Sequence, residues 1–411
     1  MTPARRQAGA TAKHASRPGA TRAEAAPPPL LGLRVVDLSW LLPGPFCTGL
    51  LADLGADVVK VERPGDGDYA RDMLPGLFRL VNRGKRSAVF DLRRDEDRDR
   101  LLDLAADADL FVEGFRPGVV DRLGVGYRHV QQRNPGIVYV SLSGYGQSGS
   151  MSQRVGHDLN YCAQAGLLAI PSSVDQSRPY RMQLPVSDLA GGMYAALSAL
   201  AALRQRDVTG RGAWLDVSLA DCALAWGGVR WADAPTARKP GWRHINPGND
   251  IFKTQDDVWL GFGLVEDKFW AAFCAAVASR SKYLRAASPP NPDQPAESLK
   301  GQRKAIAAAV ARRPARFWLS LAASHDLPVT RVAGSRAELL ADPLFSARGM
   351  WQPGSDGDPA YPVKVPGMVA AGAAPELGSA RSRLRWQSRP GTAHADRSRP
   401  GSRRPDATDS K

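Results

Sequence analysis

The sequence predicts an α/β protein whose core is a parallel β-sheet. β-rich runs alternate with helix-length segments, and turn residues separate them. Short apolar runs such as Leu110–Gly114 and Ile137–Leu142 are typical of strands that are buried on both faces. Strands that alternate with helices pair in parallel through right-handed crossovers. The alternation therefore favours a layered α/β fold.

The first 222 residues contain most of this alternation. The charged, amphipathic segment Asp95–Ala108 predicts a helix, and so does the long apolar stretch from about Asp188 to Arg206. Helices are also expected over Phe46–Gly55 and after Ser218. The expected strands are Leu33–Ser39, Asp57–Glu62, Ser87–Leu92, Leu110–Gly114, Ile137–Leu142 and Trp214–Ser218.

A second, smaller domain is predicted over residues 223–335, after a large domain over residues 30–222. At 411 residues the chain exceeds the length over which one hydrophobic core keeps growing, so two domains are expected. The segment mixes strands and helices around a proline-rich surface loop at 288–295. Its expected elements are strands Ile251–Thr254 and Val258–Phe262 and helices Phe269–Ala278, Ser298–Arg312 and Ala315–Ala323.

Both ends of the chain are predicted to be disordered basic tails, over residues 1–29 and 372–411. These segments hold 14 of the 55 Lys and Arg residues but five of the 41 Asp and Glu residues, so they carry most of the net charge of +14. They lack the apolar periodicity that would dock them on a core, and deletion of residues 1–29 and 376–411 is expected to leave folding nearly unchanged. The modest charge between them argues against a nucleic-acid partner.

The chain is expected to be cytoplasmic, without a membrane partner and without a metal site. It opens with no apolar signal segment, and its longest apolar run, Leu189–Leu203, is too short to cross a bilayer. The cysteines stand singly in apolar surroundings, as reduced core residues do, and lack the spacing of metal ligands. They are Cys47, Cys162, Cys222 and Cys274.

One glycine motif does not predict a nicotinamide site. Gly144–Gly149 fits the G-x-G-x-x-G pattern and follows an expected strand. The dinucleotide fingerprint also needs a helix that opens on the loop and an acidic residue about 20 positions later, and both are missing. The glycines are better explained by a tight turn, whose exposed N–H groups could hold a phosphate or an enolate oxygen.

Two groups suited to proton transfer stand where helix-like segments begin: His157 in Gly-His-Asp-Leu-Asn-Tyr and Asp188 in Val-Ser-Asp-Leu-Ala-Gly-Gly. Two such bases facing one pocket could remove a proton from one face of a carbon and return one to the other face. Glu266 follows an apolar strand and could orient the imidazole. Structural roles stay open: His157 and Asp188 as helix caps, with a helix dipole that favours ionised Asp188, and Glu266 as a first-turn acid.

A series of motifs follows in a characteristic order along the chain. The segments are Gly32–Leu38, Pro43–Pro45, Leu51–Val58, Val61–Pro64, Asn82–Arg86, Glu113–Gly118, Ser143–Gln147, Gly210–Gly212 and Asp216–Leu219. Over roughly residues 30–350 the series resembles the family III CoA-transferases of the CaiB/BaiF type. Ser150 departs from the pattern, because the family usually has Pro there. The Gly-His-Asp-x-Asn-Tyr motif, with the later Asp and Glu, resembles the α-methylacyl-CoA racemase branch.

The resemblance implies a Rossmann-like large domain to which residues 336–371 return, a small domain from the middle of the chain, and an interlocked homodimer. It implies that His157 and Asp188 are the acid/base pair and that Glu266 hydrogen-bonds the histidine. The CoA contacts would fall on Arg63, Phe90, Asp91, Leu92, Arg93 and Arg122, and the thioester site on Gly156, Asp158, Leu159, Asn160 and Tyr161.

The expected activity is therefore that of an acyl-CoA racemase or epimerase in lipid metabolism, acting on 2-methylacyl thioesters through an enolate. A thioester makes its α-proton removable when fixed donors stabilise the enolate oxygen. Arginines such as Arg63 and Arg93 suit the phosphates of CoA. Coenzyme A enters as part of the substrate, and the chemistry needs no permanently bound cofactor.

Two alternatives remain. The first is acyl-CoA:carboxylate CoA-transfer, in which an aspartate attacks the thioester and becomes an aspartyl-CoA thioester. Asp175 lies at roughly the place of that nucleophile, but the glycine-run loop of several transferases is missing after Gly248. The second, from another class, is a non-catalytic acyl-CoA-binding protein. The acyl group and the stereochemical preference are not encoded in any motif that we recognise.

Overall fold

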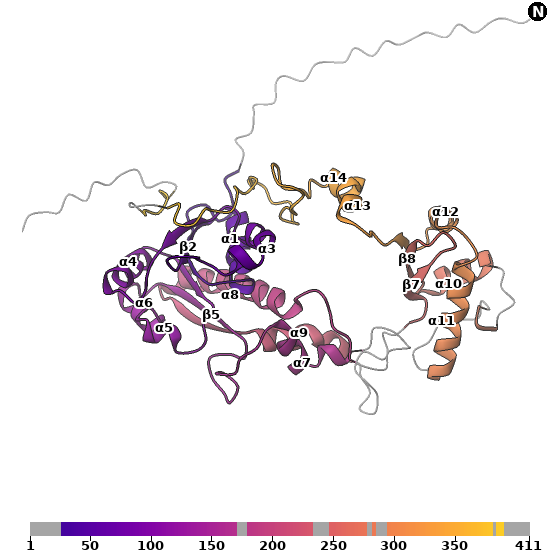
Figure 1. Cartoon of the computed structure of the whole chain (residues 1–411), viewed down its shortest axis with the longest axis horizontal. Coiled ribbons are helices and arrows are strands. Elements are labelled where there is room, and N and C mark those ends of the chain that lie inside the picture. Colours follow the sequence, from indigo (N-terminus) through magenta and orange to yellow (C-terminus); the bar gives the residue numbers. More distant parts are fainter. Residues whose placement is uncertain are drawn as a thin grey trace, which may run out of the picture.

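Every neighbouring pair of strands in the main sheet is parallel, in the order β3-β2-β1-β4-β5-β6. The computed structural model describes residues 26–170, 179–232, 246–277, 282–284, 294–380 and 384–389. The α/β class predicted from the sequence is confirmed, and all six expected strands are present (Figure 1). The strands are β1 (Arg34–Leu38), β2 (Asp57–Glu62), β3 (Arg86–Val89), β4 (Leu110–Glu113), β5 (Val138–Ser143) and β6 (Ala213–Ser218).

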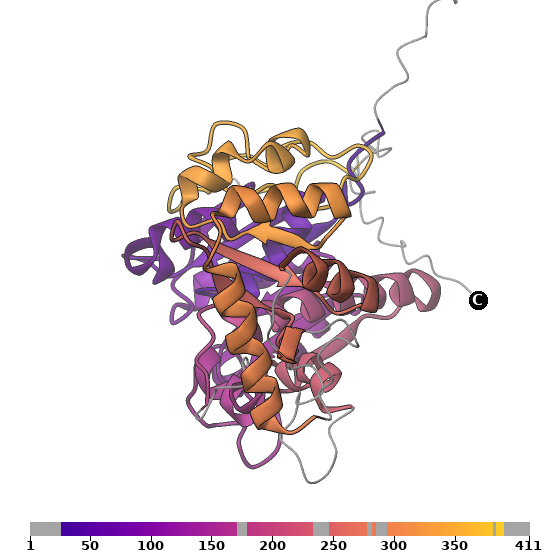
Figure 2. The ribbon, with the colours of Figure 1, turned by 90° about the vertical axis from the view of Figure 1, so that its right-hand side faces the viewer.

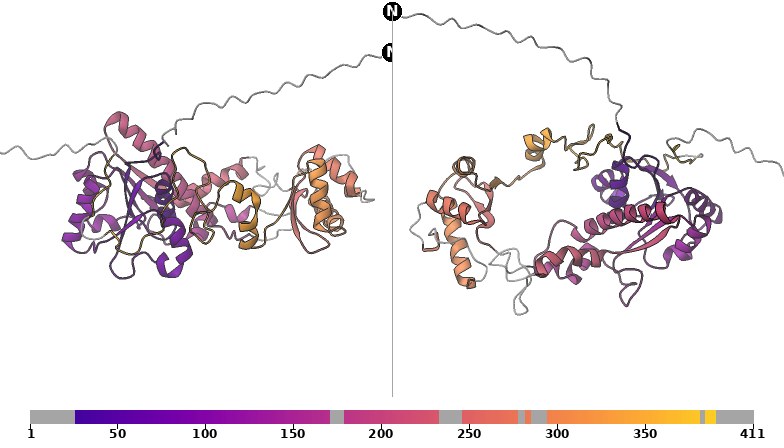
Figure 3. Two further views of the ribbon diagram at one scale, coloured as in Figure 1. Left: turned by 90° about the horizontal axis from the view of Figure 1, so that it is seen from above. Right: turned by 180° about the vertical axis from the view of Figure 1, so that it is seen from behind.

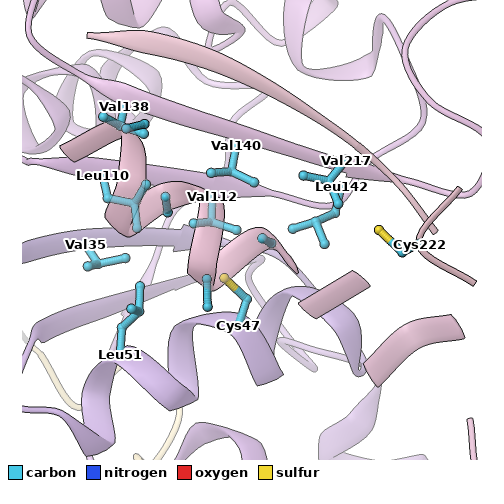
Figure 4. Close-up of a cluster of buried hydrophobic side chains, with 14 of the residues drawn as sticks. Val35, Cys47, Leu51, Leu110, Val112, Val138, Val140, Leu142, Val217 and Cys222 are labelled. Carbon is cyan, nitrogen blue, oxygen red and sulfur yellow. The ribbon is translucent and has the colours of Figure 1, made fainter. Parts of the chain in front are cut away.

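Helices cover both faces of this sheet. Successive strand residues point to opposite faces, so Val35 packs in one core cluster with α1 and α8, and Val36 packs in the other with α4, α5 and α6 (Figure 4 shows the first). The helices of this domain are α1 (Pro43–Asp53), α2 (Ala70–Met73), α3 (Pro75–Asn82), α4 (Asp95–Ala106), α5 (Val119–Arg122), α6 (Tyr127–Arg133), α7 (Asp158–Gln164), α8 (Val186–Thr209) and α9 (Leu219–Trp231), with a 3₁₀ turn, η1, at Leu167–Ala169.

Helix α8 is longer than the sequence suggested and lies close against α1. A Cβ added at Gly192 would come within 2.7 Å of the carbonyl oxygen of Pro43, so only glycine allows this approach. At 24 residues α8 has the length and apolar composition of a membrane span, and half of its apolar window is buried inside the protein, as in a core helix.

The small domain stands apart from the large one in the views of Figures 1 and 3, and in Figure 2 it lies in front of the large domain. Its antiparallel sheet, β7-β8-β9, packs on α10, α11 and α12 around buried Phe262, Phe273 and Trp318. The boundary predicted at residue 223 falls inside α9, which ends at Trp231. The elements are β7 (Asn249–Lys253), β8 (Trp259–Gly263), β9 (Val329–Arg331), α10 (Asp267–Val277), η3 (Lys282–Leu284), α11 (Ala296–Val310) and α12 (Ala315–His325), followed by α13 (Arg336–Ala341) and α14 (Pro343–Ala347).

After α14 the chain returns to the large domain and stays on it beyond residue 371. Ala380 donates to the carbonyl of Ser87 at 2.8 Å, beside strand β3. Trp386 packs against the core face under α4, and its Nε1 donates to the carbonyl of Leu104 at 3.1 Å. The prediction of a disordered tail from residue 372 is therefore wrong for residues 372–380 and 384–389. A single tryptophan can dock a segment that has no apolar periodicity, and this was the signal missed.

Trp386→Ala is expected to lower the free energy of unfolding by about 1–3 kcal/mol, less than a fully buried tryptophan would cost, because the ring is half-buried. Urea unfolding measures the change. Removal of residues 390–411 is the control, and their composition predicts no comparable loss. Equal stability of Trp386→Ala and the intact chain would show that the docking of this segment contributes nothing.

Candidate active site

A pocket of about 410 Å³ opens at the carboxyl ends of β1, β4 and β5. This is the position where the strand order reverses, between β1 and β4, and where open α/β sheets bind ligands. His157 and Asp188 both line it, as do Gly156 and Tyr161. A larger cavity, of about 620 Å³, lies between α4 and the segment around Trp386, and neither base lines it. The two groups selected from the sequence thus share one site.

His157 is the N-cap residue of α7 and is exposed. Its backbone N–H donates to Oδ1 of Asn160 at 3.1 Å, so Asn160 holds the turn and does not line the pocket. The hydroxyl of Tyr161 donates to the carbonyl of Gly156 at 2.5 Å and closes the loop that leads into the helix. Capping and an imidazole that faces the pocket therefore occur together at His157.

Asp188 occupies the third position of α8, because the helix begins at Val186 after an N-cap at Pro185. The prediction that Asp188 is itself the N-cap is wrong. Burial raises the pKa of Asp188 to about 7, and the carboxylate of Asp158 adds to that rise. Burial and the neighbouring carboxylate thus favour the neutral form of Asp188, whereas the sequence suggested a helix dipole that favours the ionised form. A carboxyl group with this pKa can both accept and donate a proton near neutral pH.

Asp158 fixes the spacing between the two bases. Its Oδ1 accepts the backbone N–H of Ser187 at 2.7 Å and that of Asp188 at 3.2 Å, so the first turn of α7 is tied to the first turn of α8. Asp158 and Leu159 do not line the pocket, although the family resemblance implied that they would. Asp158 contributes through these two contacts, because its neighbour His157 and its partner Asp188 both face the cavity.

Asp188→Asn is expected to stabilise the folded protein at about pH 8 by about 1–3 kcal/mol. The pKa of the folded-state carboxyl lies above its ordinary value of 3.8, so the stability that the neutral form provides is lost as pH rises through about 7. Asn has no charge to desolvate. Urea unfolding at about pH 5.5 and about pH 8 should show a gain that grows with pH. Asp207→Asn, on the same helix but exposed, is the control. A gain that is equal at both pH values would contradict this account.

A second cavity, of about 350 Å³, adjoins the first and shares only Trp40 and Phe115 with it. It contains five of the six predicted CoA contacts, namely Arg63, Phe90, Asp91, Leu92 and Arg93. Arg122, in α5, is outside it. The Arg93 guanidinium is held by Asp91 at 2.8 and 3.0 Å, whereas that of Arg63 lies over the Tyr69 ring at 4.5 Å.

Trp40 forms the wall between the two cavities, and the sequence analysis missed it. Its ring makes edge-to-face contacts with the rings of Tyr69 and Phe115, at centroid distances of 5.0 and 5.4 Å. The next residue, Leu41, has a φ of 62°, a left-handed conformation that is rare without glycine. Buried Asp68 holds that conformation by accepting the Leu41 N–H at 3.1 Å. Strain at a pocket wall is a common sign of function, but no local sequence pattern reveals it.

Two fully buried ion pairs lie beneath this wall. Lys60 Nζ contacts Asp68 at 2.8 Å and also donates to the carbonyl of Ser39. Lys85 Nζ contacts Asp37 at 2.9 Å. Burial raises the pKa of Asp37, but the charges of both lysines and two hydroxyl hydrogen bonds outweigh it and hold the carboxyl well below its ordinary range. The loop after β1 therefore rests on charged groups that have no access to water.

The predicted partner of the imidazole, Glu266, is not in this site. Glu266 is exposed at the start of α10 in the small domain and does not line the pocket of His157. Asp175 lies outside the described residues. In the glycine loop, the N–H of Gln147 donates to Asp216 at 2.9 Å, and no helix opens before α7. The loop is a turn, as the sequence suggested.

Three comparisons extend these observations. The family model of CoA-transferase family III matches residues 30–393. The chain is 33% identical to the acetyl-CoA:oxalate CoA-transferase of Acetobacter aceti, over 82% of this chain and 90% of that protein. It is 35% identical to the α-methylacyl-CoA racemase of Mus musculus, over 62% of this chain and 66% of that enzyme. The crystal structure of a CaiB/BaiF family protein from Brucella suis is similar with a TM-score of 0.74 and 26% identity, over 86% and 98% of the two chains.

Proposed function

Because the chain belongs to CoA-transferase family III, whose members act on acyl-CoA thioesters, we propose that it is an acyl-CoA racemase or epimerase that interconverts 2-methylacyl-CoA epimers. The observation that carries the proposal is that His157 and Asp188 line one pocket. The nucleotide part of CoA would lie beside Arg63 in the adjoining cavity. The pantetheine arm would then pass Trp40, which both cavities share, and bring the thioester between the bases.

The proposed reaction moves one proton off the α-carbon and another onto its opposite face. One base removes the proton, the electron pair moves into an enolate, and the other group, in its acid form, protonates the far face. The hydroxyl of Ser143 is buried in the pocket wall without a hydrogen-bond partner among the described residues, and it could donate to the enolate oxygen. These groups are sufficient for the chemistry, so CoA would enter only as part of the substrate.

An interlocked homodimer would complete the site. Within one chain, Glu266 belongs to a small domain that stands apart from the large domain in Figure 1, and it does not line the pocket. The partner subunit's Glu266 could reach His157 if two chains interlock, and it would then orient the imidazole. The apolar side chains of Leu197, Leu224 and Val229, exposed on α8 and α9 of a single chain, would be covered in such a dimer.

CoA transfer to a carboxylate is the second candidate. It is favoured by the similarity to an acetyl-CoA:oxalate CoA-transferase along most of the chain. Asp188 is the one carboxylate that lines the pocket, so it would be the nucleophile among the described residues. Its attack would expel the CoA thiolate and leave a mixed anhydride. The thiolate would then attack the aspartyl carbonyl, release the first acid and leave an aspartyl-CoA thioester.

Incubation of a single epimer of a 2-methylacyl-CoA in D₂O separates these reactions. The racemase predicts deuterium at the α-carbon and the appearance of the other epimer without any acceptor acid, followed by NMR and chiral chromatography. Transfer of CoA to an added carboxylate, with no α-exchange, would reject the racemase in favour of the transferase. Tight binding with neither reaction would indicate a non-catalytic acyl-CoA-binding protein.

A further inference from the structure

Two arginines line the pocket beside the proposed acid/base pair. Arg116 follows β4, and Arg154 lies in the loop before α7. Both are exposed, and neither forms an ion pair within the described part of the chain. A guanidinium keeps its charge at any physiological pH and presents several donors in a plane, which suits a carboxylate or a phosphate.

A hydrogen bond between residues next to these arginines connects the two loops. Nε2 of Gln153 donates to the carbonyl of Pro117 at 3.3 Å. Gln153 directly precedes Arg154, and Pro117 directly follows Arg116. Arg116 and Arg154 therefore belong to two loops that contact each other, and both residues line the pocket.

The positive charges of Arg116 and Arg154 do not neutralise the carboxylate of Asp188. Among the described residues, Asp188 is the one acidic residue that lines the pocket. Burial and Asp158 raise its pKa to about 7, and no cation in that part of the chain acts against the rise. Burial raises the pKa of Tyr161 to about 12, and there the charge of Arg116 acts against the rise. Arg116 is thus close enough to act on the inner wall of the pocket but does not neutralise Asp188.

We propose that the acyl group of the substrate carries a second carboxylate, which Arg116 and Arg154 bind. This inference rests on the proposed function and specifies its substrate class as short, branched dicarboxylic acid monothioesters. The phosphates of CoA are the other possible anions. The adjoining cavity, with Arg63, offers them a separate place, and it contains neither Arg116 nor Arg154.

The test compares two substrates of the same carbon skeleton, 2-methylsuccinyl-CoA with its thioester next to the methyl branch, and 2-methylbutanoyl-CoA. The intact protein is expected to favour the carboxylated thioester in kcat/KM by roughly 10–100-fold. Arg116→Gln and Arg154→Gln should lower kcat/KM for that substrate alone and leave the affinity for free CoA unchanged. Arg128→Gln, exposed on α6 outside the pocket, is the matched control.

An equal loss on both substrates and on free CoA would overturn the inference, because the arginines would then bind the phosphates of CoA. A binding measurement keeps the inference separate from the proposed function. S-(3-carboxypropyl)-CoA and S-butyl-CoA are thioethers that undergo no enolate chemistry, and calorimetry gives their affinities. Suppose that the protein binds the carboxylated thioether more tightly, that both arginine variants abolish this preference, and that no thioester exchanges its α-proton. The racemase proposal would then be rejected, and the carboxylate-binding role of the arginines would be retained. Equal affinities of the two thioethers would reject the inference alone.

Discussion

His157→Gln is expected to reduce racemisation by roughly 10²–10⁴-fold while the protein stays folded and binds CoA. Inversion needs one base on each face of the α-carbon, so the loss of either base stops it in both directions. The variant should still exchange deuterium into the epimer whose α-proton faces Asp188, with retention of configuration. Asp188→Asn should show the complementary pattern with the other epimer, and the double variant should be inert. NMR in D₂O and chiral analysis of the product measure both effects.

Two exposed residues serve as controls for this experiment. The control variants are His129→Gln and Asp207→Asn. His129 lies on α6 and Asp207 near the end of α8, and neither residue lines the pocket. If His157→Gln is tolerated while Asp188→Asn abolishes CoA transfer, the racemase proposal fails and Asp188 is the nucleophile. Hydroxylamine trapping of a thioester on Asp188 would then identify the covalent intermediate.

Lys85→Met is expected to lower the free energy of unfolding by about 3–5 kcal/mol. The variant leaves Asp37 in the core without the ammonium group that contacts it at 2.9 Å. Lys85 also donates to the carbonyl of Pro45 at 2.9 Å, so the first turn of α1, beside the pocket, loses a support as well. Urea unfolding of the full chain measures the loss.

Lys304→Met, an exposed lysine on α11, is the control and should change stability by no more than about 0.5 kcal/mol. Adding Asp37→Asn to Lys85→Met should recover part of the loss, because no uncompensated charge then remains in the core. If Lys85→Met and Lys304→Met unfold at the same urea concentration, the buried pair does not hold the loop as described. If Lys85→Met is too unstable to purify, the double variant Lys85→Met with Asp37→Asn is measured in its place. The buried-charge explanation predicts that the double variant is more stable than Lys85→Met.

The class of the fold and the strands of the sheet followed from local pattern. Strands that are buried on both faces must be apolar at successive positions, so a segment such as Ile137–Leu142 identifies itself without its neighbours. The start of α8 could not be predicted from the local sequence in the same way. Asp188 looks like an N-cap in sequence, yet the helix begins at Val186, because the Asp158 carboxylate of another helix supplies the acceptor for the first N–H groups. Such a partner, 29 residues away, leaves no mark on the local sequence.

The site shows the same division. The motifs around His157 and Asp188 were enough to select these two residues, because each motif places its polar group near the start of a helix. The pKa of Asp188, near 7, depends on how much water the folded pocket excludes, and this is a property of packing. Trp40, Arg116 and Arg154 enter the site only because the ends of β1 and β4 and the loop before α7 meet at one edge of the sheet. Local pattern reports the faces and ends of individual elements, whereas the tertiary structure decides which of those ends share a cavity and what charge the cavity carries.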